Sequence, residues 1–165
     1  MPTTEPGPLA YLITFSTYGT HLHGDPRGSV DVRHNLPGTP HLAEDPRRMA
    51  NAVAKLSHEP YTLGLDERRI VDQTIREACK HKGWALLALN VRTNHVHLLV
   101  NARVEPAQVM STAKAWATRR LAEAGRVPRG RTVWTSGGSK RKLWNDGAVN
   151  NAWDYVVDGQ GPSLL

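Results

Sequence analysis

Two histidines separated by one hydrophobic residue stand in the run Asn94-His95-Val96-His97-Leu98-Leu99-Val100. Because side chains alternate along a β-strand, both imidazoles would point to one face while the valines and Leu98 enter a core on the other. Neighbouring imidazoles on one face can bind one divalent metal ion. Divalent metals that bind phosphate also prefer oxygen ligands, so a third ligand from Gln, Asn or Asp is expected. The sequence therefore predicts a metal site on the floor of a sheet.

Tyr155 is the second candidate for chemistry. Apolar spacing predicts a helix from about Asp146 to Asp158. Tyr155 lies on the flank of its apolar stripe, together with Asn151 and Asp158. From there a tyrosine can present its hydroxyl to a site, and it can attack a phosphodiester when a metal polarises the phosphoryl oxygen. Tyr18 is the second-best candidate nucleophile. The stripe predicted to face inward comprises Val149, Ala152, Trp153, Val156 and Val157.

The elements that must position these residues alternate between strands and helices. Strands are predicted over Tyr11–Thr17, 84–91 and 94–100, with a short one over 142–144. One helix is predicted with Asp66 as its N-cap and Gly83 just past its end. A second is opened by Glu105-Pro106 and closed by Gly125, a third surrounds Tyr155, and a short one covers about 45–56. This order favours an α+β domain, an antiparallel sheet with helices packed on it.

The chain of 165 residues is expected to form one domain. We expect a disordered N-terminus over residues 1–9, the domain over 10–160 and a tail over 161–165, with a long excursion over 18–65. The sequence lacks an apolar run of the ~20 residues needed to cross a bilayer. The first eight residues have neither the basic nor the apolar region of a signal peptide, and Cys79 is the single cysteine, so we expect a cytoplasmic protein without an internal disulfide.

Positive charge is concentrated in one segment. The chain carries +6 in total, but residues 114–142 hold nine basic residues against one acid, Glu123, which gives that segment +8. Such asymmetry favours a polyanionic partner, most commonly nucleic acid, over a merely solvated face. The candidate DNA-binding residues in this segment are Arg119, Arg120, Arg126, Arg129, Arg131, Lys140, Arg141 and Lys142.

At these residues the chain resembles the single-tyrosine HUH transposases, also called insertion-sequence-200-like transposases, and their REP-associated relatives. The resemblance rests on residues 94–100, the opening strand over 11–17 and the late helix with Tyr155, and it covers residues 9–160. It implies a ferredoxin-like or RRM-like HUH nuclease core. It further implies that His95 and His97 hold Mg²⁺ or Mn²⁺, and that Tyr155 attacks single-stranded or hairpin DNA. The products would be a 5′-phosphotyrosine and a free 3′-hydroxyl that can re-join another strand.

The third metal ligand is where the chain departs from this family. Several members place a glutamine four residues after the tyrosine, but here that position is Gly159 and Gln160 follows it. A bend at Gly159 would bring Gln160 to the metal, and Asp158 is the rival ligand. The resemblance also implies that the basic segment holds DNA, with Trp134 and Trp144 available for stacking on bases. It does not decide whether the protein is a monomer or a homodimer.

Other interpretations of the same residues exist. The run His21-Leu22-His23 repeats the His–hydrophobic–His spacing, but it lies in a stretch rich in Gly, Asp and Pro where strand alternation is not guaranteed. For the whole protein, one alternative is a domesticated module that binds DNA hairpins without cutting them. Another is an RNA-binding protein that uses the same basic surface. Both predict binding without covalent attachment to DNA.

Overall fold

The computed structural model describes residues 5–20 and 59–165. The strands in this part of the chain are β1 (Ala10–Ser16), β2 (Ala85–Val91), β3 (His95–Asn101) and β4 (Ser139–Leu143). The helices are α2 (Leu65–Lys82), α3 (Pro106–Glu123) and α4 (Asp146–Val157). The predicted His21-Leu22-His23 motif, the short helix and most of the 18–65 excursion lie outside the described residues.

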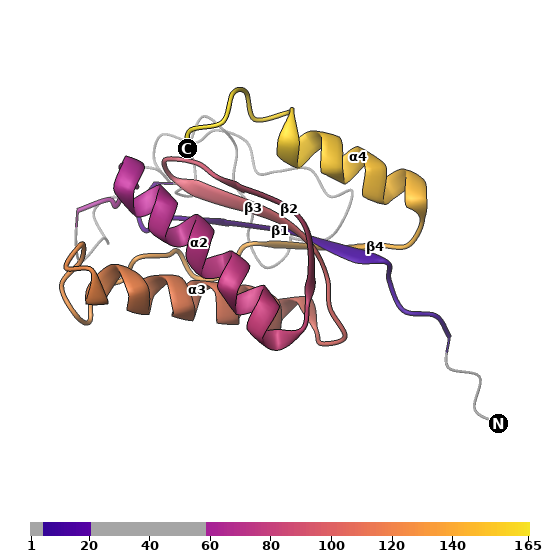
Figure 1. Ribbon diagram of the computed structural model, residues 1–165, viewed down its shortest axis with the longest axis horizontal. Helices are drawn as coiled ribbons and strands as arrows, with labels where there is room; N and C mark the ends of the chain where they lie inside the picture. The colour runs from indigo at the N-terminus through magenta and orange to yellow at the C-terminus, as the bar shows by residue number, and fades with distance from the viewer. Residues whose placement is uncertain (1–4, 21–58) are drawn as a thin grey trace, which may run out of the picture.

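The four strands form one antiparallel sheet in the order β2-β3-β1-β4. The segments β1-α2-β2 and β3-α3-β4 are therefore two split β-α-β units, each spanning a strand of the other, which is the ferredoxin-like arrangement. This confirms the predicted α+β class. The chain adds α4 after the second unit, and Figure 1 shows α2 and α3 on one side of the sheet with α4 on the other.

Strand alternation separates the two faces of the sheet as predicted. On the side of α2 and α3, Phe15, Val96 and Leu98 belong to the larger hydrophobic core. On the side of α4, Leu12 and Leu99 belong to a smaller cluster. Because His95 and His97 alternate with the residues of the larger core, both histidines lie on the face that α4 covers.

Capping residues mark the two ends of α2 and the start of α4. In α2 the N-cap is Gly64 rather than the expected Asp66, which lies in the first turn, and Gly83 ends the helix in the left-handed conformation with φ 72°. In α4 the side chain of Asn145 accepts a 2.8 Å hydrogen bond from the amide of Ala148. No helix in the described ranges is long and apolar enough to span a bilayer.

Two tryptophan predictions are wrong. Trp134 is only 7% exposed, because it packs edge-on against Phe15 at 4.9 Å and donates its indole hydrogen to the carbonyl of Lys114. It is therefore a core residue and not a stacking surface for DNA. Trp153 is 43% exposed instead of buried, because α4 rests on the sheet through its narrow Ala152 and Val156 side.

Candidate metal and tyrosine site

The two histidines stand side by side on β3 with β1 as their neighbouring strand. His97 lies opposite Thr14 and His95 lies opposite Ser16 in the antiparallel register. The imidazole centroids are 4.7 Å apart. His97 is only 3% exposed, since α4 covers it, whereas His95 lies closer to the surface.

His97 has one satisfied and one unsatisfied ring nitrogen. Its Nδ1 is 2.8 Å from the hydroxyl of Thr14, but its buried Nε2 has no hydrogen-bond partner within the described residues. Burial lowers the pKa of His97 to about 4, and His95 and Arg92 lower it too, with Gln160 acting in the opposite direction. The imidazole is therefore neutral at pH 7. If Nδ1 donates to Thr14, the lone pair of Nε2 faces the site.

His95 is oriented by its own neighbour in the motif. Its Nδ1 lies 2.6 Å from the side-chain oxygen of Asn94, which can only accept, so Nδ1 carries the hydrogen, and in the neutral ring Nε2 carries the lone pair. That Nε2 is 3.5 Å from Oε1 of Gln160. A hydrogen bond like the one from Nδ1 to Asn94 fixes the tautomer and the direction of a histidine whose other nitrogen binds a metal.

Gln160 returns to the histidines because the chain unwinds after α4. The amide of Gly159 donates to the carbonyl of Asp154 at 3.0 Å, which ends the helix one turn after Tyr155. The Gln160 amide nitrogen then donates to the carbonyl of Tyr155 at 3.3 Å, so its oxygen is the atom directed at His95. Arg92 holds the following segment by donating to the carbonyl of Pro162 at 2.7 Å.

This donor set fits a divalent metal. It offers two imidazole nitrogens and an amide oxygen, and the buried unpartnered Nε2 of His97 is the observation that a ligand would explain. The described residues hold no group of three or more His, Cys, Asp or Glu side chains, so Asp158 does not join the two histidines in such a cluster. Gln160, rather than Asp158, is the third group beside them.

Tyr155 contacts His97 of its own chain. Its ring lies 5.2 Å from that of His97, centroid to centroid, and the side chain is 47% exposed. Two other tyrosines are engaged elsewhere. Tyr11 donates its hydroxyl hydrogen to the carbonyl of Val104 at 2.8 Å. The hydroxyl of Tyr61 is buried, and burial, together with the charge of Glu67, raises its pKa.

The predicted basic residues divide between the two faces of the molecule. Those near α2 and α3 are engaged with acids or carbonyls: Arg120 binds Glu77 at 2.9 Å, Arg126 binds Asp66 at 3.2 Å and Arg131 donates to the carbonyl of Glu59 at 2.6 Å. On the same side, Arg119 lies over the ring of Trp116 and Lys142 lies 3.6 Å from Glu105. This helix face is opposite the histidines, so it does not share a surface with them (Figure 1).

Lys114, which opens the basic segment, is also a structural residue. Its ammonium donates to the carbonyls of Thr135 and Gly137 at 2.8 and 2.6 Å and lies 5.6 Å from the ring centre of Phe15. Burial, with the charge of Lys140 in addition, lowers the pKa of Lys114 to about 8. Lys114 thus fastens the loop before β4 to α3.

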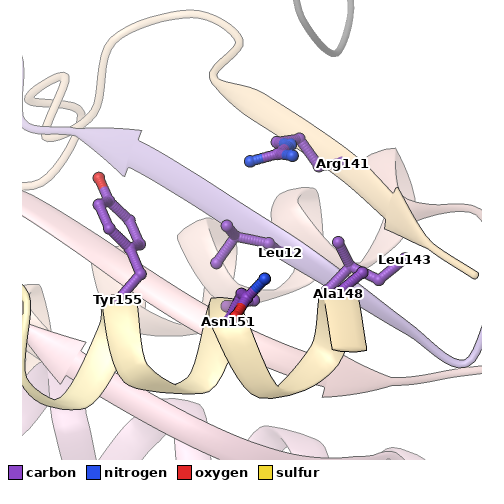
Figure 2. Close-up of a pocket in the computed structure, with 7 residues that line it drawn as sticks. Leu12, Arg141, Leu143, Ala148, Asn151 and Tyr155 are labelled. Carbon is purple, nitrogen blue, oxygen red and sulfur yellow. The ribbon is translucent and has the colours of Figure 1, made fainter. Parts of the chain in front are cut away.

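Arg141 is the one basic residue of β4 directed to the α4 side. It pairs in register with Leu12, and both line a groove between β4 and α4 that also contains Asn151 and Tyr155. The groove measures about 300 Å³. Figure 2 shows Arg141 on β4 and Tyr155 on α4 at its two sides, with Asn151 between Tyr155 and Ala148 along the helix.

The sheet, the paired histidines and the nearby helical tyrosine correspond to the arrangement that the resemblance implies. The chain belongs to the IS200-like transposase family, whose model matches residues 61–147, just over half of the chain. That match includes His95 and His97 and ends before Tyr155.

Two solved structures are similar to this chain. One is a REP-associated tyrosine transposase bound to a REP hairpin, with a TM-score of 0.51 and 9% sequence identity over 96% of this chain and 70% of the other. It supports the fold. The other, from Deinococcus radiodurans R1, is described as a putative transposase; it has a TM-score of 0.47 and 15% identity over 99% of this chain and 98% of the other. No curated protein sequence matches the chain.

Sequence reasoning missed Thr14 and underrated Asn94. Thr14 is a polar residue inside the otherwise apolar stretch of β1, and the antiparallel register places it beside His97. A polar side chain between apolar neighbours, on the face of the strand that carries the histidines, is the signal that could have identified it. The pairing of β1 with β3 cannot be derived from either strand alone, so its partner remained unknown.

Proposed function

We propose that the protein is a metal-dependent nuclease and strand transferase for single-stranded or hairpin DNA, with Tyr155 as its nucleophile. Membership of a transposase family supports a DNA-cleaving activity. The structure of the REP-associated relative holds a REP hairpin, which supports DNA as the partner here. The observation that carries the proposal is the buried, unpartnered Nε2 of His97, which lies beside His95 and next to the exposed Tyr155.

Each residue has a defined task in this reaction. His95, His97 and Gln160 would hold Mg²⁺ or Mn²⁺, and such a metal, when bound, polarises the phosphoryl oxygen of the scissile phosphate. Thr14 and Asn94 fix the ring orientations of the two histidines. The low pKa of His97 keeps its imidazole neutral, so the ligand does not have to lose a proton at pH 7.

Tyr155 carries out the covalent step. Its oxygen forms a bond to phosphorus while the bond from phosphorus to the 3′ oxygen breaks. Tyrosine gives up its phenolic proton and the departing oxygen takes one up, which yields a 5′-phosphotyrosine and a 3′-hydroxyl. The reverse attack by a 3′-hydroxyl restores the tyrosine and joins a strand, so rejoining needs no external energy source.

Covalent capture of DNA tests the proposal. Single-stranded DNA from around the protein's own gene is labelled at its 3′ end, so that the label remains on the fragment attached to tyrosine. The protein is incubated with this DNA and Mn²⁺ or EDTA, and the products are separated on a denaturing gel. We expect a Mn²⁺-dependent adduct in the wild type and in Tyr18→Phe, and none in Tyr155→Phe.

The other outcomes identify what is wrong. An adduct that persists in Tyr155→Phe assigns the nucleophile to another residue. An adduct in EDTA contradicts the metal requirement. Tight binding of hairpin DNA without any adduct contradicts the nuclease and favours the non-cutting module, and tight binding of RNA alone favours the RNA-binding alternative.

A further inference from the structure

We propose that the groove between β4 and α4 binds one unstacked nucleotide adjacent to the scissile phosphate, with Arg141 on its phosphate and Asn151 on the edge of its base. The proposal rests on the proposed function, because it takes Tyr155 as the position of the scissile phosphate. The groove would select the nucleotide beside the cleavage position, a role that neither the family match nor the two histidines assign to any residue. The proposal also separates Arg141 from the other basic residues of its segment.

The groove is adjacent to the reacting centre. Tyr155 lines it at one end, and the ring of Tyr155 lies against His97 on its other side. A strand whose phosphate lies between Tyr155 and the histidines therefore has its neighbouring nucleotide at the groove. The volume of about 300 Å³ is at the lower limit of pockets that hold small organic ligands, about 300–1,000 Å³.

The lining offers what a nucleotide needs. Leu12, Leu143 and Ala152 provide an apolar floor on which the flat face of a base can lie. The carboxamide of Asn151 supplies one acceptor and two donors, which suits the mixed edge of a base, and asparagine pairs in bidentate fashion with adenine. The side chains of Asn151 and Arg141 have no hydrogen bond or ion pair within the described part of the chain.

The absence of a carboxylate beside Arg141 distinguishes it from Arg120, Arg126 and Lys142 on the opposite face. Arg120 and Arg126 bind acids of α2, and Lys142, the next residue on β4, lies near Glu105. A guanidinium with five donors and no acid partner is the group that binds a phosphate in a forked geometry. Arg141 is thus the basic side chain of β4 that DNA at Tyr155 would meet.

Binding in the absence of metal tests the groove without requiring cleavage. A fluorescent dT15 strand is titrated with protein in EDTA at several salt concentrations, and Kd is measured by anisotropy. Lys142→Gln is the matched comparison for Arg141→Gln, since it removes the same charge from the same strand on the other face. We expect Arg141→Gln to weaken binding about tenfold and Lys142→Gln about twofold or less. Arg141→Gln should also reduce the salt slope by about 0.7, the value for one phosphate of a single strand.

Base selection provides the second measurement. In the adduct assay, an abasic site is moved along the DNA, one position at a time. We expect the wild type to lose adduct about tenfold when the abasic site occupies one position flanking the scissile phosphate. Asn151→Ala should become insensitive to the base at that position, whereas Asn150→Ala, a neighbouring exposed asparagine outside the groove lining, should retain the wild-type pattern.

The two measurements separate the two proposals. Equal weakening by Arg141→Gln and Lys142→Gln overturns the groove, even when the wild type forms its adduct normally. An adduct that is indifferent to every flanking abasic site overturns it as well. A wild type that forms no adduct at all contradicts the proposed function, and the comparison of Arg141 with Lys142 in the binding assay then still decides whether the groove takes DNA.

Discussion

Protonation of His97 should destabilise the metal-free protein at mildly acidic pH. In the folded protein, burial holds the pKa of His97 at about 4, whereas an unfolded chain has an ordinary histidine pKa near 6.5. Between these values the unfolded state binds the proton and the folded state does not, so the free energy of unfolding falls as pH falls. The difference between the two pKa values corresponds to about 3 kcal/mol in the free energy of unfolding. This contribution is fully present above pH 6.5 and is lost by pH 4.

Urea unfolding in EDTA between pH 7 and pH 4 measures this loss. His97→Asn is the informative variant, because asparagine keeps a donor near Nδ1 for Thr14 and lacks the titrating ring. We expect the variant to lose about 3 kcal/mol less than the wild type over this range, whatever its stability at pH 7. His81→Asn removes an exposed histidine of α2 and should follow the wild-type curve.

Parallel pH curves for the wild type and His97→Asn would refute the reasoning, because they would mean that His97 is not held neutral by its surroundings. The same variant provides a second readout at pH 7. Mn²⁺ at a hundred times its Kd should stabilise the wild type by about 2.7 kcal/mol through binding to the folded state alone. His97→Asn should lose this stabilisation, and a variant that retains it would contradict the assignment of His97 as a ligand.

Three further changes address the surroundings of the site. Gln160→Ala should raise the Mn²⁺ concentration needed for half-maximal adduct formation by at least about tenfold, whereas Asp158→Ala should change it by less than about twofold. The reverse result would make Asp158 the third ligand. Thr14→Val should weaken Mn²⁺ binding about 10- to 100-fold in calorimetry, because it removes the partner of His97 Nδ1, and unchanged affinity would show that the ring is held by packing alone. Gly138→Ala should destabilise the protein by about 1–3 kcal/mol more than Gly137→Ala in urea. Both glycines have a positive φ, but a Cβ at Gly138 would lie 2.5 Å from the carbonyl of Thr14, whereas one at Gly137 meets nothing within 4 Å; equal losses would attribute both to backbone conformation.

Local periodicity predicted most of the fold. The alternation in β3 was sufficient to place both histidines on one face and the intervening valine in the core, because the period of a strand leaves no other choice once one face is buried. Helix ends marked by Gly83 and Pro106 were likewise visible in the sequence. What the sequence lacked was the order of the strands, which arises from long-range packing and decides that Thr14 lies beside His97.

The basic segment shows a second limit of sequence reasoning. Composition gives the net charge of residues 114–142 but not the face of the molecule on which each charged side chain lies. Successive residues of β4 point to opposite faces of the sheet. Arg141 consequently faces the groove, while Lys142 lies near an acid on the helix side. A charged segment that crosses from helix to loop to edge strand therefore cannot be treated as one surface. Trp134 illustrates the same point, since a tryptophan between basic residues became part of the core.

Gln160 could not be chosen over Asp158 from spacing, because both choices assume a path for the chain after the last helical turn. A continuous helix would carry the residue four positions after Tyr155 to the same face, and that residue is a glycine. In the structure the helix stops first, and a Cβ at Gly159 would lie only 2.8 Å from the carbonyl of Tyr155. The glycine is thus required for the close turn that shifts the glutamine by one position and still directs its oxygen to His95. An extra residue before the glutamine is compatible with the proposed metal site when the helix ends early enough to absorb it.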